Sequence, residues 1–132
     1  MENIKIIQAN FLEINAKRNP EFSGKLKLKT SIKINTLEES KKTKNVLKVG
    51  YTFEIDYGDL GKVKIKGELY LLSDPKTAKI LLNSKENNNY NTQEYTEITN
   101  LIIKKASVKA FELEEELNLP IHIKLPVFSI KK

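Results

Sequence analysis

The chain has no cysteine and no tryptophan, and it has one histidine, His122, among its 132 residues. Without cysteine, neither disulfides nor thiolate chemistry is available. A serine nucleophile needs a base within hydrogen-bond reach, and a single histidine allows few such arrangements. His122 stands between two isoleucines, whereas a metal site normally needs several converging ligands. We therefore expect no enzyme activity, no catalytic residues, no metal site and no cofactor.

Long hydrophobic runs are also missing. The longest unbroken apolar run covers residues 69–72, which is far too short to cross a bilayer. The N-terminus has no basic segment followed by an apolar one, as a signal peptide would have. We therefore expect a cytoplasmic protein without membrane insertion. The length predicts a single domain over residues 1–132. With 39% hydrophobic and 30% charged residues, the chain is typical of globular rather than disordered proteins.

What is present is alternation. Apolar and polar residues alternate over residues 4–14, 25–34, 46–57 and 62–72, which predicts four strands with one buried and one solvated face. In the third stretch, every second residue from Leu47 to Tyr57 is apolar. The short glycine-bounded link at residues 58–61 is typical of a β-hairpin. The four stretches together indicate an antiparallel sheet that is covered on one face.

The first stretch differs because it carries apolar residues at both parities: Ile4, Ile6, Leu12 and Ile14 at one, and Ile7, Ala9 and Phe11 at the other. Two explanations stay open. A bulge near Gln8 could shift the parity, or the strand could be covered on both sides. The second explanation would require a partner subunit.

Helical signals follow the strands. Asp74-Pro75 is a helix start, with an N-cap acceptor before a proline at the first helical position. We expect helices over residues 75–83 and 92–118. The longer helix has one apolar stripe for the sheet, made of Tyr95, Ile98, Ile102, Ala106, Leu113 and Leu117. Leu101, Val108 and Phe111 lie roughly opposite. They indicate either an interface or scattered surface hydrophobics.

The last segment, residues 119–132, is apolar but contains Pro120 and Pro126. Proline excludes a helix across it and disfavours a central strand. We expect an extended segment that lies on a surface or along a sheet edge.

Basic residues outnumber acidic ones by 23 to 17, giving a net charge of +6. Seven lysines could share one face of the sheet: Lys25, Lys27, Lys29, Lys33, Lys62, Lys64 and Lys66. Roughly six to ten phosphate contacts are enough for strongly salt-dependent nucleic-acid binding. However, lysines on a solvated face also keep a sheet soluble and block edge pairing. Arginine, the usual reader of bases, occurs only as Arg18. We weigh a solvated face above a nucleic-acid surface.

The order of four strands, a short helix, a long helix and a proline-punctuated apolar segment resembles the SecB-like export chaperone family, from Ile4 to Phe128. Two local cues accompany this order. One is Leu-Tyr-Leu-Leu-Ser-Asp-Pro at residues 69–75. The other is Leu-Asn-Leu-Pro at residues 117–120 with Pro-Val-Phe at residues 126–128.

The resemblance implies an ATP-independent holdase whose sheets pair through strand one and the long helix into dimers or tetramers. It implies that clients lie in apolar grooves lined by the first connecting loop and the C-terminal segment. The corresponding client-binding residues would be Phe22, Ile121, Ile123, Leu125, Val127 and Phe128. Classical members are acidic and dock the basic tail of the SecA motor on their sheet. This chain carries lysines there, so we do not expect that docking.

We therefore predict an α+β fold, a four-stranded antiparallel sheet with one face covered by a long C-terminal helix. We predict a protein that binds unfolded or preprotein polypeptides and forms a homo-oligomer. The expected oligomer interface consists of Ile7, Ala9, Phe11, Leu101, Val108 and Phe111. The alternative function is nucleic-acid binding on the lysine-rich sheet face.

Overall fold

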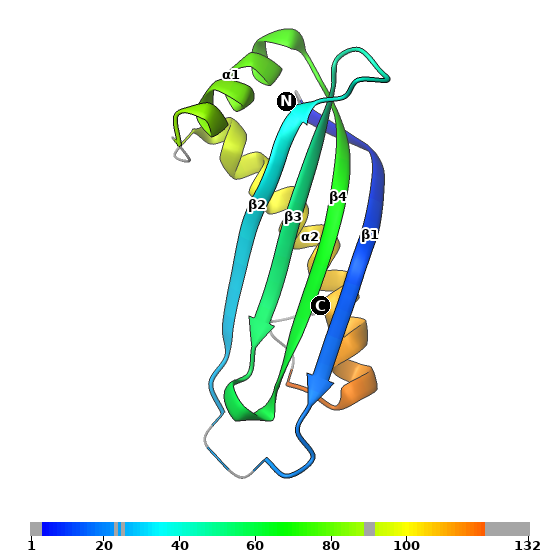
Figure 1. The fold of residues 1–132 in the computed structure, drawn as a ribbon, viewed down its shortest axis with the longest axis vertical. Helices are drawn as coiled ribbons and strands as arrows, with labels where there is room; N and C mark the ends of the chain where they lie inside the picture. Colours follow the sequence, from blue (N-terminus) through cyan, green and yellow to red (C-terminus); the bar gives the residue numbers. More distant parts are fainter. Residues whose placement is uncertain (1–3, 23, 25, 89–91, 121–132) are drawn as a thin grey trace, which may run out of the picture.

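The computed structural model describes residues 4–22, 24, 26–88 and 92–120. The strands are β1 (Ile4–Arg18), β2 (Lys29–Glu39), β3 (Val46–Asp56) and β4 (Gly61–Ser73), with a 3-10 turn, η1 (Gly58–Leu60), between the last two. The helices are α1 (Pro75–Glu86) and α2 (Gln93–Leu117). The strands form one antiparallel sheet in the order β1-β4-β3-β2, and α2 crosses behind it (Figure 1). The predicted α+β fold is confirmed.

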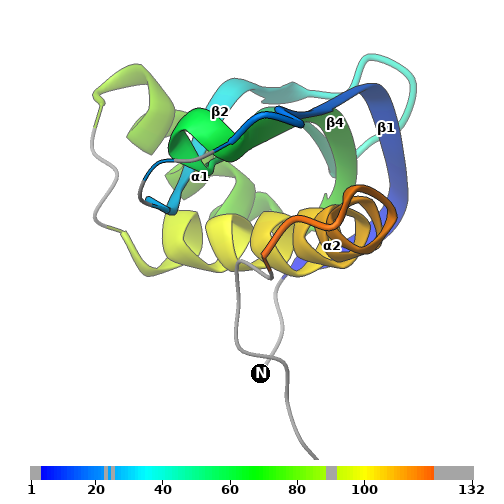
Figure 2. The same cartoon turned by 90° about the horizontal axis from the view of Figure 1, so that it is seen from below.

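The core lies between the sheet and α2. Figure 2 shows the sheet curving over α2, so that the helix covers one face and leaves the other open. From β3 and β4, the alternate residues that face α2 are buried, including Phe53, Ile55 and Ile65. The helix contributes Ile98, Ile102, Ala106 and Ala110, all fully buried. Apart from Ala110, these residues belong to the first predicted stripe of the long helix, and its other members, Tyr95, Leu113 and Leu117, pack against the same core.

The ends of several elements differ from the prediction. For the strands, the reason is that a strand continues only where a neighbouring strand pairs with it. β2 begins at Lys29, which pairs with Asp56 at the end of β3. Residues 26–28 continue the alternating pattern but have no described strand beside them. β1 continues past residue 14 to Arg18, which pairs with Gly61 at the start of β4. β2 runs on to Glu39, and α1 runs on to Glu86.

Two irregularities in β1 explain its apolar residues at both parities. The register with β4 shifts between Ile6 and Gln8 and again between Phe11 and Glu13. Each shift reverses which parity faces the core. The helix-facing residues are therefore Ile4, Ile6, Ala9, Phe11, Ile14 and Ala16, because they pair with β4 residues of the buried parity or share that face. The bulge near Gln8 was one of the two explanations that the sequence left open.

Local capping fixes both helices. The Asp74 side chain accepts a hydrogen bond from the Thr77 backbone N–H at 3.3 Å, and Pro75 follows it. Hydrogen bonding by the Thr77 side chain, and then by its backbone N–H, lowers the pKa of the Asp74 carboxyl below its ordinary value. Thr92 caps α2 by accepting from the Tyr95 N–H at 3.2 Å. Neither described helix is both long and apolar enough to cross a membrane.

Candidate functional site

β1 is an edge strand. It pairs with β4 on one side, and no strand in the described part of the chain pairs with its other side. Backbone N–H and C=O groups along that side are available to another extended chain. The two bulge positions, Ile7 and Leu12, are 51% and 63% exposed. Charged residues and bulges normally protect a free edge, and here the two bulge positions carry exposed apolar side chains.

Below this edge, an open groove of about 570 Å³ runs between β1 and α2. We call it the β1–α2 groove. Its lining residues are Ile6, Phe11, Leu101, Lys104, Lys105, Val108, Lys109 and Glu112. Phe11 faces the helix because it pairs with Gly67, which lies on the buried face of β4. The strand and the helix do not close on each other, and Phe11 and Val108 remain 44% and 65% exposed.

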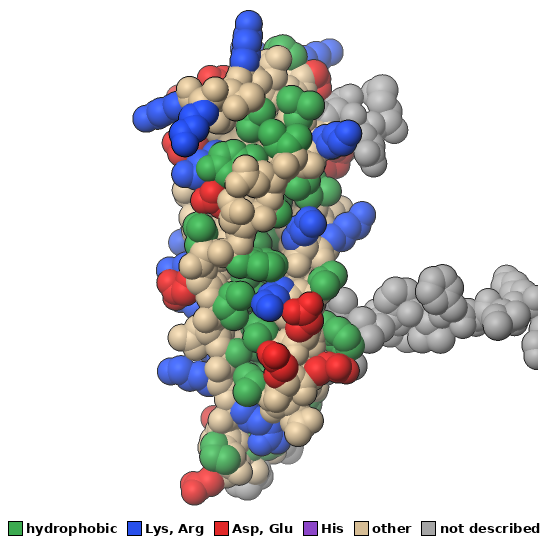
Figure 3. All heavy atoms as spheres, turned by 90° about the vertical axis from the view of Figure 1, so that its right-hand side faces the viewer, with side chains coloured by type: hydrophobic (Ala, Val, Ile, Leu, Met, Phe, Trp, Pro, Cys, Tyr) green, Lys and Arg blue, Asp and Glu red, His purple; other side chains and the backbone are tan. Residues whose placement is uncertain are grey.

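Charges line the helix side of this groove. Lys109 Nζ forms an ion pair with Glu112 Oε2 at 3.2 Å, one helical turn further on. Lys104 and Lys105 are exposed beside them. Figure 3 faces the β1 side of the molecule and shows hydrophobic side chains in a band along its length, with basic side chains on both sides and acidic side chains beside its lower part. The groove is therefore apolar along its length, and its helix side carries Lys104, Lys105, Lys109 and Glu112.

The structure brings together three of the six residues predicted for the oligomer interface. Phe11, Leu101 and Val108 meet in the β1–α2 groove. Ile7 and Ala9 are exposed on the same strand. Phe111 is half-buried and does not line the groove. The second apolar stripe of the long helix is thus partly an extension of the core and partly a groove wall, because Leu101 also packs against the core.

The connection between β1 and β2 holds the one described residue of the predicted client site. Phe22 is half-buried and packs against the core. Its segment is anchored to η1, since the Asn19 N–H donates to the Leu60 carbonyl at 2.7 Å. The other predicted client-binding residues, Ile121, Ile123, Leu125, Val127 and Phe128, lie outside the described residues. Their roles stay predictions.

Two residues of this connection escaped the sequence prediction. Leu26 and Leu28 are 48% and 41% exposed. The alternation over residues 25–34 predicts that they lie within the second strand, on its buried face. The end of β3 at Asp56 removes the neighbour they would need, and the alternation alone carries no sign of this. They add exposed apolar surface directly before β2, which lies at the opposite edge of the sheet from β1.

Two side-chain contacts fix the end of α2 relative to the sheet. The Tyr57 hydroxyl donates a hydrogen bond to the Glu114 carboxylate, and both side chains are fully buried. Burial raises the pKa of the Tyr57 hydroxyl well above its ordinary value, and the bond to Glu114 raises it further. At the end of the helix, Arg18 Nε donates to the Asn118 carbonyl at 3.4 Å. These contacts hold the far end of α2 beside the end of β1.

The outer face of the sheet carries five of the seven predicted lysines: Lys29, Lys33, Lys62, Lys64 and Lys66. Lys27 precedes β2 instead, and Lys25 lies outside the described residues. The register places Lys62 opposite Asp56, Lys64 opposite Glu54, and Lys66 opposite Glu13. Cross-strand neighbours of opposite charge stabilise a sheet and neutralise each other. This mixed pattern favours a solvated face over a continuous surface for phosphates.

Comparison with known proteins finds similarity to solved structures. No protein-family model matches the chain, and no curated protein matches its sequence. Among solved structures, it is similar to the Mycobacterium tuberculosis SecB-like chaperone Rv1957, which was solved in complex with a ChAD peptide from the Rv1956 HigA1 antitoxin. The TM-score is 0.57 at 11% identity, over 98% of this chain and 94% of that chain. The chain therefore has a SecB-like fold.

Proposed function

We propose that this chain is a chaperone that holds non-native polypeptides in an extended form, without ATP, by binding alone. The observation that carries this proposal is the uncovered apolar strip on one side of the molecule. It consists of the β1 edge with Ile7 and Leu12 and the β1–α2 groove with Phe11 and Val108. Monomeric soluble proteins rarely leave such contiguous apolar surface exposed unless something binds it.

The strip offers what an unfolded chain needs. An extended segment can place its apolar side chains in the groove beside β1. Micromolar affinity requires about 8 kcal/mol. Each large apolar side chain contributes about 1.5–3 kcal/mol when it is fully buried. A few such side chains offset the cost of ordering the client. Because buried apolar area does most of the binding, many sequences fit.

We further propose that two copies pair edge to edge along β1. Antiparallel pairing of the two edges would cover Ile7 and Leu12 and would satisfy the unpaired backbone groups. It would also place the two α2 helices on the same face of one continuous sheet. Their two grooves would then form a trough whose floor comes from both β1 strands. In this proposal, assembly completes the client site, and the protein acts in the cytoplasm.

The SecB-like neighbour supports the proposal because it was solved with a bound peptide. The fold, which this chain shares over almost all of its length, is thus compatible with peptide binding. The apolar strip described above is an independent reason for it, since it depends only on residues of this chain.

The test is suppression of aggregation. A client unfolded in guanidinium chloride is diluted with and without the protein, and light scattering is followed with no nucleotide present and again with added ATP. We expect the intact protein to suppress scattering at about one oligomer per client, and ATP to change nothing. Val108→Asp, in the groove, should weaken suppression at least about tenfold, since it places a charge where client side chains must be buried.

Leu72→Asp is the matched control. Leu72 is 44% exposed, but it lies on the outer face of the sheet, away from the groove. This variant should suppress aggregation like the unmodified chain. An intact protein that leaves scattering unchanged would overturn the proposed function. Equal losses in the two variants would remove the groove from it.

A further inference from the structure

A second hollow, of about 870 Å³, lies between the turn joining β2 to β3 and the first helix. We call it the hairpin–α1 groove. Its floor is apolar, with Val46 and Leu47 from β3 and Ala78 and Leu82 from α1. Its rim carries four lysines: Lys41, Lys42 and Lys44 on the hairpin and Lys79 on the helix. It shares no residue with the β1–α2 groove.

Both walls of this groove are held by short backbone contacts. The Ser40 N–H donates to the Val46 carbonyl at 2.8 Å and closes the hairpin. Asn45 takes a left-handed conformation with φ of 64°, and its carbonyl accepts from the Ser73 N–H at 3.0 Å. Ser73 is the last residue of β4, and Asp74 caps α1 immediately after it. The hairpin and the helix are thus fixed to the same point of the chain.

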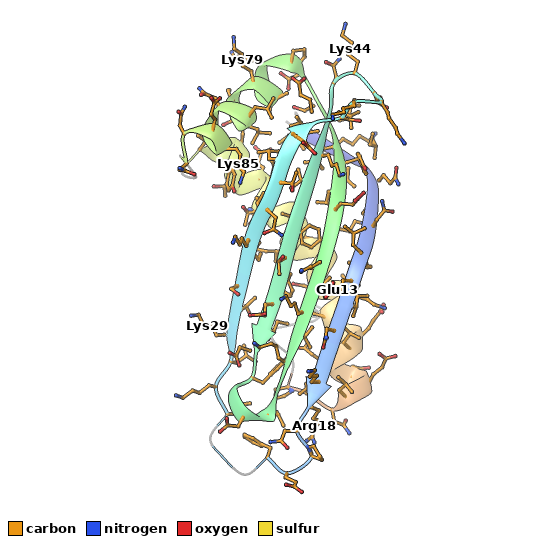
Figure 4. The ribbon with its side chains drawn as sticks, viewed as in Figure 1. Glu13, Arg18, Lys29, Lys44, Lys79 and Lys85 are labelled. Carbon is orange, nitrogen blue, oxygen red and sulfur yellow. The ribbon has the colours of Figure 1, made fainter. Side chains whose placement is uncertain are left out.

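The rim has an excess of positive charge. The four lysines face only two acidic lining residues, Glu39 and Glu86. Within the described part of the chain, none of these four lysines forms an ion pair. Figure 4 shows Lys44 on the hairpin and Lys79 on α1 at the same end of the molecule. Several unpaired lysines around a hollow attract an anionic ligand.

The lining indicates which anionic ligand fits. Among the residues that the structure describes, the lining contains no aromatic residue on which a base could stack and no arginine to read one. Instead, it has an apolar floor that can bury aliphatic side chains. A ligand that combines carboxylates with aliphatic side chains satisfies both parts of the groove.

We propose that the hairpin–α1 groove docks an acidic segment of a partner protein in which aliphatic side chains alternate with glutamate or aspartate. The aliphatic side chains contact Val46, Ala78 and Leu82, and the carboxylates contact the lysines of the rim. This site is separate from the one that holds clients, and it does not depend on the proposed function.

The test uses a fluorescein-labelled synthetic peptide of alternating glutamate and leucine, whose binding to the full chain is followed by fluorescence anisotropy. We expect binding that weakens as salt rises. Lys42→Glu combined with Lys79→Glu should weaken it at least about tenfold, because each substitution replaces an attraction by a repulsion. Lys17→Glu combined with Lys27→Glu makes the same change in net charge far from the groove, and it should leave the affinity within about twofold.

Four results would overturn the proposal. The peptide could fail to bind, or the two double variants could lose affinity equally, which would show a net-charge effect only. Val108→Asp could abolish binding while the Lys42/Lys79 variant keeps it, which would make the peptide an ordinary client of the β1–α2 groove. An oligothymidylate could bind more tightly than the peptide at the same lysines, which would indicate a nucleic-acid site.

Discussion

The Tyr57 hydroxyl donates a hydrogen bond to the Glu114 carboxylate across the core, joining the residue after β3 to the last turns of α2. Both side chains are fully buried. A buried carboxylate is costly unless it is hydrogen-bonded. This contact therefore helps to hold the C-terminal part of α2 against the sheet. The same helix forms one wall of the β1–α2 groove.

Tyr57→Phe is expected to lower the free energy of unfolding by about 2 kcal/mol, because Glu114 stays buried and loses this donor. Urea unfolding followed by circular dichroism measures the change. Tyr51→Phe, at another buried tyrosine, is the control and should cost less. In the double variant Tyr57→Phe/Glu114→Leu, much of the loss should be recovered, because both polar partners are then gone. Additive losses in this cycle would show that the two side chains are not coupled.

The same pair predicts a pH dependence. Burial, and then the bond to Glu114, raise the pKa of the Tyr57 hydroxyl above its ordinary value of 10.0. The folded chain thus keeps this proton more tightly than the unfolded chain. The resulting stabilisation is fully present below pH 10 and is lost as pH rises above it. Between about pH 9 and 11, the stability of the unmodified chain should fall more steeply than that of Tyr57→Phe. Parallel curves would contradict this.

A side chain at Gly67 is predicted to destabilise the fold. It lies between Tyr51 and Phe11 in neighbouring strands, and a Cβ atom there would sit 2.6 Å from Tyr51 Cζ and 2.9 Å from the Asn10 carbonyl oxygen. Gly67→Ala should cost about 2 kcal/mol, because the Tyr51 ring must move within a packed core. Gly50→Ala is the control. Its Cβ would meet Thr36 at 3.3 Å, so a smaller loss is expected in the same urea titration.

Self-association along β1 is expected to depend on the two bulge residues. Ile7→Lys with Leu12→Lys should give a protein that sediments with the mass of one chain at micromolar concentration, while the unmodified chain sediments as a multiple. Both side chains are more than half exposed, so the folded subunit should survive the change. Leu26→Lys with Leu28→Lys, in the β1–β2 connection, should leave the mass unchanged. An unmodified chain that sediments as a monomer would exclude the proposed pairing.

Much of the fold could be predicted from local patterns. The alternation from Leu47 to Tyr57 identifies β3 and its buried face, since a period of two is a property of the strand itself. Asp74-Pro75 marks the start of α1 for an equally local reason, because the cap satisfies N–H groups of the first turn. The first stripe of α2 follows from helical spacing. None of these features needs knowledge of what lies nearby.

The candidate site was predicted less completely. Phe11, Leu101 and Val108 were assigned to one surface, and the structure brings them together in the β1–α2 groove. Leu26 and Leu28 were assigned to a strand, although β3 ends before it could pair with them. The hairpin–α1 groove was not predicted, because its walls come from two segments with no common pattern.

The sequence by itself determined the types of the elements, their order and the faces that must be buried, because period, caps and breakers act within a few residues. Only the tertiary structure decided that β1 pairs with β4 alone and is therefore an edge strand. It also decided the positions of the two register shifts in β1 and the separation between β1 and α2. These properties depend on contacts between residues far apart in the chain, and the unfilled space beside Phe11 and Val108 is their result.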